Sequence, residues 1–340
     1  MTKRPTIIDV ARLAGVSKAT VARVVSGQDV LVREETRERV LKAVDELGYE
    51  RNAIAGSLRT DQTFMVALCI PDITNPFWTV VARGVQDAIE ASGYTTVTVN
   101  SDWTAEREKN YLRMVRRNRF DGLIINPTSV SSEALSRLGV PVVILGSGDN
   151  QPDFDSVGSD TEAAVQDALE HLLQLGHRRI ALIAGRSQRR RELARYLSYR
   201  LFHQRHELPL DESLVIECEF SERDGYEAMQ QFLNLPQPPT AVFCANDLLA
   251  IGALKAAQAL DRHIPADISI IGMDDIYAAS MTSPSLTTVA KPKYEIGVMA
   301  ARMLLERMNG DAPDSARHVR IQCQFVQRGS TGAVRTSVNQ

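Results

Sequence analysis

The chain has 340 residues, of which 44% are hydrophobic and 24% are charged, which excludes both a disordered chain and a membrane-embedded one. A single hydrophobic core seldom serves so long a chain, so we expect two or three domains. The net charge of −3 argues against a nucleic-acid partner, but residues 1–60 carry 11 lysines and arginines against 8 acidic residues, whereas the remainder carries 28 against 34. A basic head on an acidic body is typical of a nucleic-acid-binding module joined to another domain.

The sequence indicates neither a targeting segment nor redox chemistry. The N-terminal stretch MTKRPTIIDV lacks the apolar core of a signal peptide, and no later apolar run approaches the length of a membrane span. We therefore expect a cytoplasmic protein without a membrane partner. The cysteines lie far apart without CxxC spacing, so we expect buried free thiols and neither a metal site nor a disulfide. They are Cys69, Cys218, Cys244 and Cys323.

Residues 6–26, TIIDVARLAGVSKATVARVVS, predict two short helices joined by a tight turn. Thr6 and Asp9 have the spacing of a capping box, so the first helix begins at Ile7, and Gly15 permits the positive φ of the turn. Ser17 caps the second helix. One face of this helix packs, and the opposite face is free to contact a partner. The packing face holds Val21, Val24 and Val25, and the opposite face holds Ala19, Ala22, Arg23 and Ser26.

A third helix is predicted over residues 34–47, ending at Gly48. Arg33 stands at its N-cap position and has no capping oxygen, so we expect a weaker start to this helix. The following segment 52–59, NAIAGSLR, is too short to be stable as an isolated helix, and Gly56 weakens it further. Without DNA we expect a flexible linker there. The apolar stripe of the third helix consists of Val40, Leu41, Val44 and Leu47.

From Phe64 onward, short apolar runs alternate with amphipathic stretches, which is the pattern of βαβ units around a parallel sheet. Two successive sets of these runs predict two α/β lobes with a ligand cleft between them. The predicted strands cover 64–70, 95–99, 122–126, 141–145, 179–184, 214–217, 240–245 and 268–272, and the predicted helices cover 77–92, 104–118, 131–138, 187–205, 222–234, 246–261 and 292–309.

The predicted organisation is therefore an all-α helix-turn-helix head followed by an α/β core of two parallel-sheet lobes. We place the head at 1–50, a hinge helix and linker at 51–63, and the core at 64–335. Within the core, lobe 1 is expected over about 64–159 and 291–320, and lobe 2 over about 160–290 and 321–335.

This order of segments resembles the LacI/GalR family of bacterial transcription regulators over nearly the whole chain. The resemblance is carried, in sequence order, by TIIDVARLAGVSKATVARVVSG, REETRERVLKAVDELGYERNAIAGSLR, HLLQLGHRRIALIAG, FCANDLLAIGALKA, DISIIGMDD and PSLTTV. It implies a helix-turn-helix whose second helix enters the DNA major groove, and a periplasmic-binding-protein-like core.

The resemblance also implies which residues contact double-stranded operator DNA. Lys18, Ala19 and Arg23 would face base edges. Residues 52–59 would fold into a hinge helix only on the operator, where Leu58 would wedge into the minor groove and Arg59 would lie near phosphate. The full implied set is Thr6, Ser17, Lys18, Ala19, Thr20, Arg23, Asn52, Ala53, Leu58 and Arg59.

In the core, the resemblance implies a small-molecule effector bound between the lobes by residues that follow the strand ends. Other interpretations remain open for several of these residues. Asn246 and Asp274 could simply cap helices, Phe77 could be a core aromatic, and Arg189 with Arg190 could be solvated surface charge. The implied effector-binding set is Phe77, Trp78, Arg189, Arg191, Arg195, Phe220, Asn246, Asp274 and Lys291.

Two other classes of protein fit parts of the sequence. An enzyme is disfavoured because the chain has no P-loop, HExxH or GxSxG motif, and the glycines of GSG at 146–148 lack the third glycine of a dinucleotide fingerprint. We therefore predict no catalytic residue, no cofactor and no metal. A periplasmic sugar-binding protein would share the core, but it would carry a signal peptide and lack the helix-turn-helix.

The sequence thus predicts a repressor that binds a pseudo-palindromic operator as a homodimer and responds to a sugar, a sugar phosphate or a sugar acid. The tail 329–340 has no leucine heptads for a tetramer-forming coiled coil. Lys291 stands where many family members have glutamine, and Gly146 stands where an acidic residue is usual. Both departures shift the cleft toward positive charge, so we predict an anionic effector over a neutral sugar.

Overall fold

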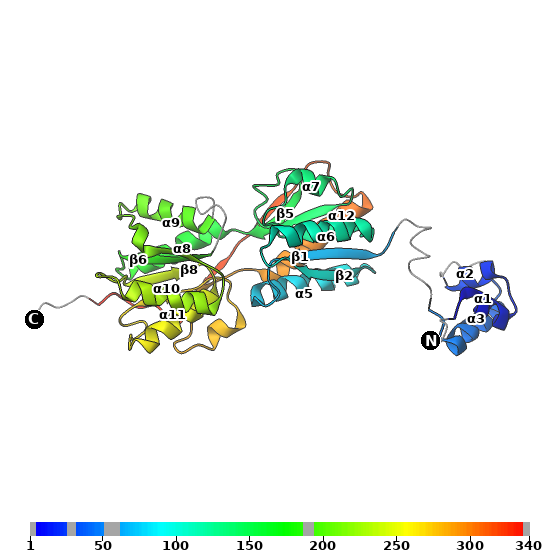
Figure 1. The fold of residues 1–340 in the computed structure, drawn as a ribbon, viewed down its shortest axis with the longest axis horizontal. Coiled ribbons are helices and arrows are strands. Elements are labelled where there is room, and N and C mark those ends of the chain that lie inside the picture. Colours follow the sequence, from blue (N-terminus) through cyan, green and yellow to red (C-terminus); the bar gives the residue numbers. More distant parts are fainter. Residues whose placement is uncertain (1–4, 26–31, 51–61, 186–193, 336–340) are drawn as a thin grey trace, which may run out of the picture. The chain divides into compact units, whose positions relative to one another are not determined.

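The computed structural model describes residues 5–25, 32–50, 62–185 and 194–335 (Figure 1). The chain divides into two compact units, Met1–Thr63 and Phe64–Gln340. Among the described residues, no helix is both long enough and apolar enough to cross a bilayer.

The first unit contains the three predicted helices, α1 (Ile7–Ala14), α2 (Lys18–Val25) and α3 (Glu34–Leu47). The Asp9 carboxylate accepts a hydrogen bond of 2.9 Å from the backbone N–H of Thr6, and Gly15 ends α1 with φ of 65°. Both observations confirm the predicted start and stop of the first helix. The small core of the unit centres on one valine from each helix, Val10, Val21 and Val40, all fully buried.

The predicted apolar stripe of α3 is wrong at one position. Leu41 is 41% exposed, and Ala43 is buried in its place. Residues Val40, Ala43, Val44 and Leu47 follow i, i+3, i+4, i+7 spacing, whereas Leu41 lies about 100° further round the helix from Val40. Arg33 precedes α3 with no side-chain cap, as predicted.

Lobe 1 is built on a six-stranded sheet in the order β11-β5-β4-β3-β1-β2, in which every pair is parallel. Alternate residues of β1 point to opposite faces, so Leu68 packs against α5 and α12 while Cys69 packs against α6 and α7. The strands are β1 (Met65–Ile70), β2 (Thr95–Asn100), β3 (Gly122–Ile125), β4 (Val142–Leu145), β5 (Asp155–Ser159) and β11 (His318–Ile321); the helices are α5 (Pro76–Glu90), α6 (Ala105–Arg117), α7 (Ser132–Ser136) and α12 (Lys293–Asn309).

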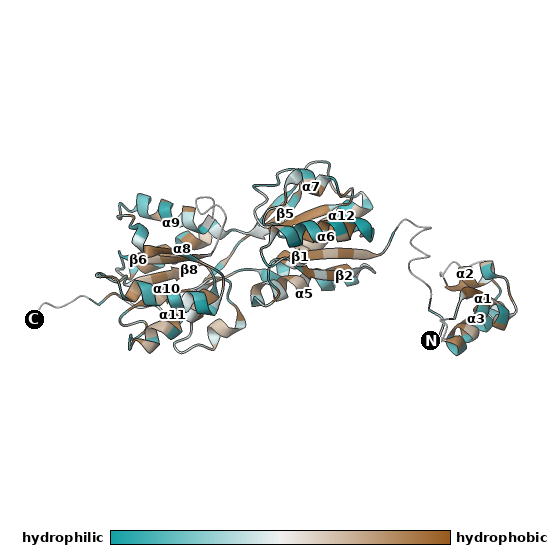
Figure 2. Ribbon diagram, viewed as in Figure 1, coloured by the Kyte–Doolittle hydropathy of each residue, from teal (hydrophilic) through white to brown (hydrophobic). Residues whose placement is uncertain are grey.

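Lobe 2 has a parallel four-stranded sheet in the order β7-β6-β8-β9, with two helices on each face. Helices α8 and α9 cover one face, and α10 and α11 cover the other. In both lobes central strands such as β1 and β8 are apolar, and the outer helix faces are hydrophilic (Figure 2). The strands are β6 (Ile180–Gly185), β7 (Val215–Cys218), β8 (Ala241–Cys244) and β9 (Ser269–Ile271); the helices are α8 (Thr161–Gln174), α9 (Ala194–Arg205), α10 (Glu222–Leu233) and α11 (Asp247–Ala259), with 3-10 turns η2 (Glu212–Leu214) and η3 (Tyr277–Ser280).

The structure confirms the two predicted parallel-sheet lobes, but several elements were not predicted. These are β5, α8, β11 and the two-stranded antiparallel sheet of β10 (Thr288–Ala290) and β12 (Gln324–Val326). The start of the helix predicted at 187 lies outside the described residues, which contain α9 from Ala194. Within the described part of the core, the chain passes between the lobes at 159–161, 290–293 and 321–324.

Each lobe contains one very close helix crossing. Where α12 crosses α5, a Cβ on Gly297 would lie 2.1 Å from the Val81 carbonyl oxygen. Where α11 crosses α10, a Cβ on Gly252 would lie 1.9 Å from the Glu222 carbonyl oxygen. Both distances are far below van der Waals contact, so only glycine fits at these two positions.

Candidate functional site

The exposed face of α2 is the predicted DNA-reading surface. Ser17 Oγ accepts a hydrogen bond of 3.1 Å from the backbone N–H of Thr20, which caps the helix as predicted. Lys18, Ala19 and Arg23 are exposed, while the opposite face of the helix is buried against α1 and α3. Two long cationic side chains therefore stand on a helix whose orientation is fixed by packing.

The remaining predicted DNA contacts divide into two groups. Thr6 is exposed at the N-terminus of α1, and Thr20 is half-buried with its hydroxyl 2.9 Å from that of Ser17. The hinge residues lie outside the described residues. They are Asn52, Ala53, Leu58 and Arg59.

A cavity of about 700 Å³ lies between the two lobes, at the carboxyl ends of their strands. Its lining includes every predicted effector-binding residue that the structure describes, while Arg189 and Arg191 lie outside the described residues. The structure therefore brings together seven residues spread over more than two hundred positions of the sequence. They are Phe77, Trp78, Arg195, Phe220, Asn246, Asp274 and Lys291.

Aromatic rings cover two sides of the cavity. Phe77 meets Trp78 edge to face at 4.9 Å between ring centroids, and both rings also belong to the core of lobe 1. Phe77 thus packs in the core of lobe 1 and also lines the cavity. On the other side, Phe220 of lobe 2 stacks on Trp103 of lobe 1 at 5.5 Å. Aromatic faces of this kind suit the apolar faces of a bound ring.

A buried ion pair lies on the inner wall of the cavity. Lys291 Nζ is 3.1 Å from Asp274 Oδ1, and each side chain is only 6% exposed. Burial lowers the pKa of Lys291, and the neighbouring Asp274 carboxylate offsets that effect only in part. Lys291 Nζ also lies 5.1 Å from the centre of the Phe77 ring, within cation–π range.

Arg195 is the second cation of this wall. Its guanidinium carbon lies 5.9 Å from the centre of the Phe220 ring, and its Nε is 3.5 Å from Met273 Sδ. Burial lowers the pKa of Arg195, and the charge of Asp274 partly opposes that shift. The side chain therefore carries its charge in a partly desolvated place with a sulfur atom, a weak acceptor, as its hydrogen-bond partner.

Asn246 both caps a helix and faces the cavity. Its Oδ1 accepts a hydrogen bond of 2.9 Å from the backbone N–H of Leu249 at the start of α11. Its Nδ2 is buried and meets no hydrogen-bond acceptor among the described residues. Asp274 caps no helix, because the next element is η3 and the N-cap of η3 is Ile276. The capping interpretation thus holds for Asn246 but not for Asp274.

Several lining residues were missed by the sequence analysis, chiefly Asn75, Trp103, Asn126, Ser198 and Arg320. Trp103 and Asn126 follow the ends of β2 and β3, so the strand-end rule that located Phe77 would also have located them. Arg320 lies on β11, which was not predicted as a strand.

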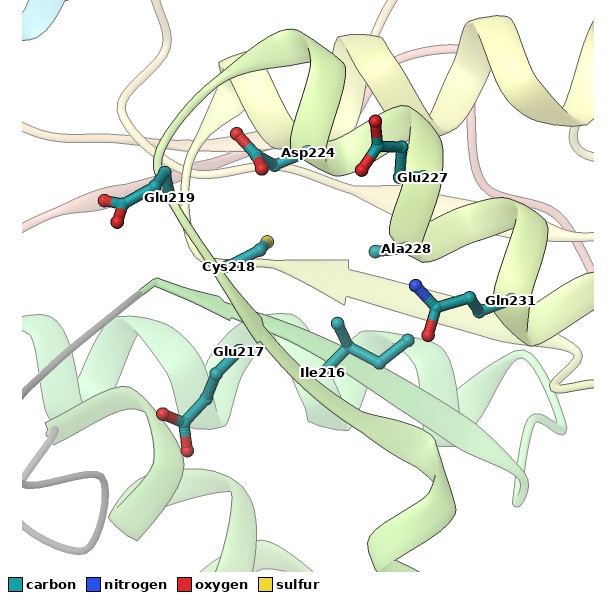
Figure 3. A pocket seen from close by; sticks show the side chains of 8 residues that line it. All are labelled: Ile216, Glu217, Cys218, Glu219, Asp224, Glu227, Ala228 and Gln231. Carbon is teal, nitrogen blue, oxygen red and sulfur yellow. The ribbon is translucent and has the colours of Figure 1, made fainter.

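A second cavity, of about 510 Å³, lies between β7 and α10 (Figure 3). The acidic residues Glu217, Glu219, Asp224 and Glu227 line it; Asp224 and Glu227 lie on the same side as Cys218, whereas the Glu217 carboxylate points the opposite way. Burial, helped by the carboxylates of Asp224, Glu219 and Glu227, raises the pKa of Cys218 to about 12, so the thiol stays protonated and is a poor nucleophile. Within the described ranges, no cluster of His, Cys, Asp and Glu has the geometry to hold a metal ion.

All four cysteines are free thiols, as predicted, although only Cys69 and Cys244 are fully buried, while Cys218 and Cys323 are partly exposed.

Comparison with known proteins agrees with this geometry. A family model described as bacterial regulatory proteins, lacI family, matches residues 6–52, and one described as a periplasmic binding protein-like domain matches residues 169–331. The chain is 35% identical to the HTH-type transcriptional regulator RegA of Clostridium saccharobutylicum, over 96% of this chain and 98% of that protein. The chain belongs to the LacI family.

This LacI-family chain also resembles solved structures of the family. It is 28% identical to the lac repressor dimer bound to operator and the anti-inducer ONPF, with a TM-score of 0.86 over 97% of this chain and 100% of that one. It is 30% identical to a LacI family transcriptional regulator from Enterococcus faecium with bound ribose, with a TM-score of 0.72 over 80% of this chain and 100% of that one. The LacI-family chain is therefore a DNA-binding transcriptional regulator and not an enzyme.

Proposed function

We propose that this regulator represses transcription as a homodimer on a pseudo-palindromic operator, and that a small molecule bound in the cleft between the lobes controls its operator affinity. The observation that carries the proposal is the presence, in one chain, of an exposed recognition face on α2 and of a cavity that both lobes line with aromatic and polar side chains. A cavity at a lobe interface can couple ligand binding to the angle between lobes.

The DNA-binding half of the proposal assigns base contacts to Lys18, Ala19 and Arg23. A single helix with so few reading positions gives too little affinity and specificity for an operator, so two copies are needed. The lac repressor, to which the chain is similar, is a dimer on its operator. Thr6, Ser17 and Thr20 would support the contact near phosphate. In the hinge, Asn52, Ala53, Leu58 and Arg59 would contact the minor groove.

The assembly is proposed to be a dimer and not a tetramer. The tail is held on lobe 2 as far as Arg335, because the Ser330 hydroxyl donates to the Ile270 carbonyl and the backbone N–H of Val334 donates to the Leu175 carbonyl. A tail that is held in this way and has no leucine heptads supports a dimer over a tetramer formed by a coiled coil. Tyr277 and Met281 of lobe 2 are 81% and 67% exposed, and such large apolar side chains support a subunit contact on this face.

The effector is proposed to be a sugar or a sugar derivative. The similar regulator from Enterococcus faecium has bound ribose. In the present cavity, aromatic rings alternate with amide, carboxylate and cationic groups, which together suit a ligand with apolar ring faces and many polar substituents. We also propose Arg189 and Arg191 as effector contacts, in addition to the seven predicted residues that line the cavity.

Three measurements test the proposal. Selection of binding sites from a random DNA pool should yield an inverted repeat, and sedimentation should show a dimer at the concentrations that bind it. Recovery of a site without two-fold symmetry, or a stable tetramer, would contradict the proposed assembly. A metabolite screen by thermal shift should then identify ligands, and these ligands should change the affinity of the protein for the selected DNA site. Lys255→Gln, on the exposed face of α11, is the control variant.

A further inference from the structure

The charges on the inner wall of the cleft do not balance. This wall consists of Arg195, Asn246, Asp274 and Lys291, and it holds two cations against one carboxylate. Asp274 is already paired with Lys291 at 3.1 Å. Arg195 therefore keeps an excess positive charge in a partly desolvated place, where an unpaired charge is costly.

Neighbouring carboxylates do not supply the missing negative charge. Asp247, directly after Asn246, is fully buried, and burial together with the charge of Asp274 raises its pKa to about 8, so it is largely neutral at pH 7. Asp275 pairs with Arg328 at 2.6 Å. Lys293 donates a hydrogen bond of 2.9 Å to the Asp275 carbonyl oxygen, which adds positive charge to the same region.

At the mouth of the cavity the charges balance or are exposed. Arg320 pairs with Asp149 at 3.2 Å, with both side chains about half exposed or more. Glu162 is also exposed, so water screens its field. Among the described lining residues, the uncompensated charge is thus confined to the inner wall.

Hydrogen-bonding groups on the same wall also favour an anion. The buried Nδ2 of Asn246 is a donor without an acceptor among the described residues, and the Arg195 guanidinium can donate two parallel hydrogen bonds. The carboxylate of Asp274, by contrast, is engaged by Lys291, so it accepts less readily from the hydroxyls of a neutral sugar. The wall offers more donors than acceptors.

We infer that the effector carries a carboxylate or a phosphate, that Arg195 and Asn246 receive this group, and that Lys291 sets the preference by acting as the counterion of Asp274. The inference rests on the proposed role of the cleft and deepens it by naming the charge class of the ligand. It makes Lys291 a specificity-determining residue, since replacing it with a neutral side chain would leave the wall without net charge.

Two single variants and their combination test the net charge of the inner wall. Asp274→Asn raises it by one unit and Lys291→Gln lowers it by one unit, while the double variant restores the original value. The single Lys291→Gln variant leaves the buried Asp274 carboxylate without its partner, and the double variant avoids this because Asp274 is replaced as well. Lys255→Gln, outside the cleft, matches the charge change of Lys291→Gln and serves as the control.

The probes are inorganic phosphate and sulfate, compared with sodium chloride at equal ionic strength, and matched sugars, namely glucose with glucose 6-phosphate and gluconate. We expect the phosphate dissociation constant from thermal shift or calorimetry to change by about tenfold for each unit of charge on the wall. The Asp274→Asn variant should bind the anion tightest, the unmodified protein and the double variant equally, and Lys291→Gln weakest. The charged sugars should bind more tightly than glucose to the unmodified protein.

Two results would overturn the inference. One is that phosphate stabilises the protein no more than chloride does, or equally in all variants. The other is that glucose binds the unmodified protein more tightly than its phosphate and its acid. Operator binding by the unmodified protein without ligand is measured in parallel. If the protein binds its operator but no anion, only the inferred charge of the ligand is wrong. If no operator can be selected, the proposed function itself is contradicted.

Discussion

The rings of Trp103 and Phe220 stack at 5.5 Å with an angle of 27° between their planes, although one belongs to lobe 1 and the other to lobe 2. Trp103 follows β2 and Phe220 follows β7, so each ring lies just beyond the carboxyl end of a strand. The pair therefore bridges the cleft beside the cavity that both residues line. A change in the angle between the lobes must alter this contact.

Tryptophan fluorescence should report ligand binding in the cleft. The chain has two tryptophans, Trp78 and Trp103, and both line the cavity. We expect a bound effector to shift their emission, because it changes the polarity around both indole rings. Replacing Trp103 by phenylalanine preserves an aromatic stack and isolates the signal of Trp78. An emission spectrum that a saturating effector leaves unchanged in the unmodified protein would mean that the ligand binds elsewhere.

Replacement of Arg23 by alanine should weaken operator binding by about 1–3 kcal/mol and relax base preference at one position in each half-site, as expected for a bidentate contact between arginine and guanine. Titration against a set of single-base operator variants measures both effects. Lys42→Ala, an exposed change on α3, provides the matched control. A loss of the same size on every variant would instead identify Arg23 as a phosphate contact.

Replacement of Leu58 by alanine should reduce specific binding and spare non-specific binding. An apolar wedge contributes only where the DNA is kinked, whereas the phosphate contacts of the basic head act on any sequence. The measurement compares the dissociation constants for operator and random DNA at one salt concentration. Equal losses on both DNAs would show that residues 52–59 act as a plain linker.

Acid should destabilise the core through Asp155. This side chain is fully buried; burial opposes its ionisation, but hydrogen bonds from Arg307 and Arg317 outweigh that effect and lower its pKa from 3.8 to about 2. Because the folded pKa is depressed, the group stabilises the fold above pH 4, and this stabilisation is lost as the pH falls toward 2. The pKa difference corresponds to about 2 kcal/mol.

Urea unfolding at a series of pH values, with the unmodified protein and Asp155→Asn, checks this expectation. The variant should be less stable at pH 7, because Arg307 and Arg317 lose a charged partner, and the difference should shrink as the pH approaches 2. A difference that stays constant with pH would contradict the role assigned to the ionised carboxylate.

Local signals explain why much of the fold was predictable. The capping pair Thr6 and Asp9, the turn glycine Gly15, and the apolar runs of the buried strands each depend on a few neighbouring residues. Leu41 was assigned wrongly because a helix of 14 residues with apolar groups on adjacent positions permits more than one stripe. Strand β5, DSVGS, has too few apolar residues to be recognised, since its place in the sheet is fixed by its neighbours β4 and β11.

The sequence predicted many of the residues that line the candidate site, but not the ion pair and hydrogen bonds that they make. The strand-end rule and the family resemblance together identified residues from Phe77 to Lys291. No sequence pattern indicated that Lys291 would pair with Asp274, or that the Nδ2 of Asn246 would be buried without an acceptor. These features depend on how the chain returns to the cleft between β10 and α12, which is a property of the assembled lobes.

The glycine crossings at Gly297 and Gly252 limit how the core can respond to a ligand. Helices in such close contact cannot slide past one another, so each lobe has little internal freedom. If a ligand changes the angle between the lobes, the change must be taken up as rotation about the segments 159–161, 290–293 and 321–324. Strand β1 runs roughly 20 Å from the cleft edge back to Met65, given about 3.3 Å per residue. A rotation about these segments would therefore displace Met65, at the end of β1 away from the cleft, further than the residues at the cleft edge.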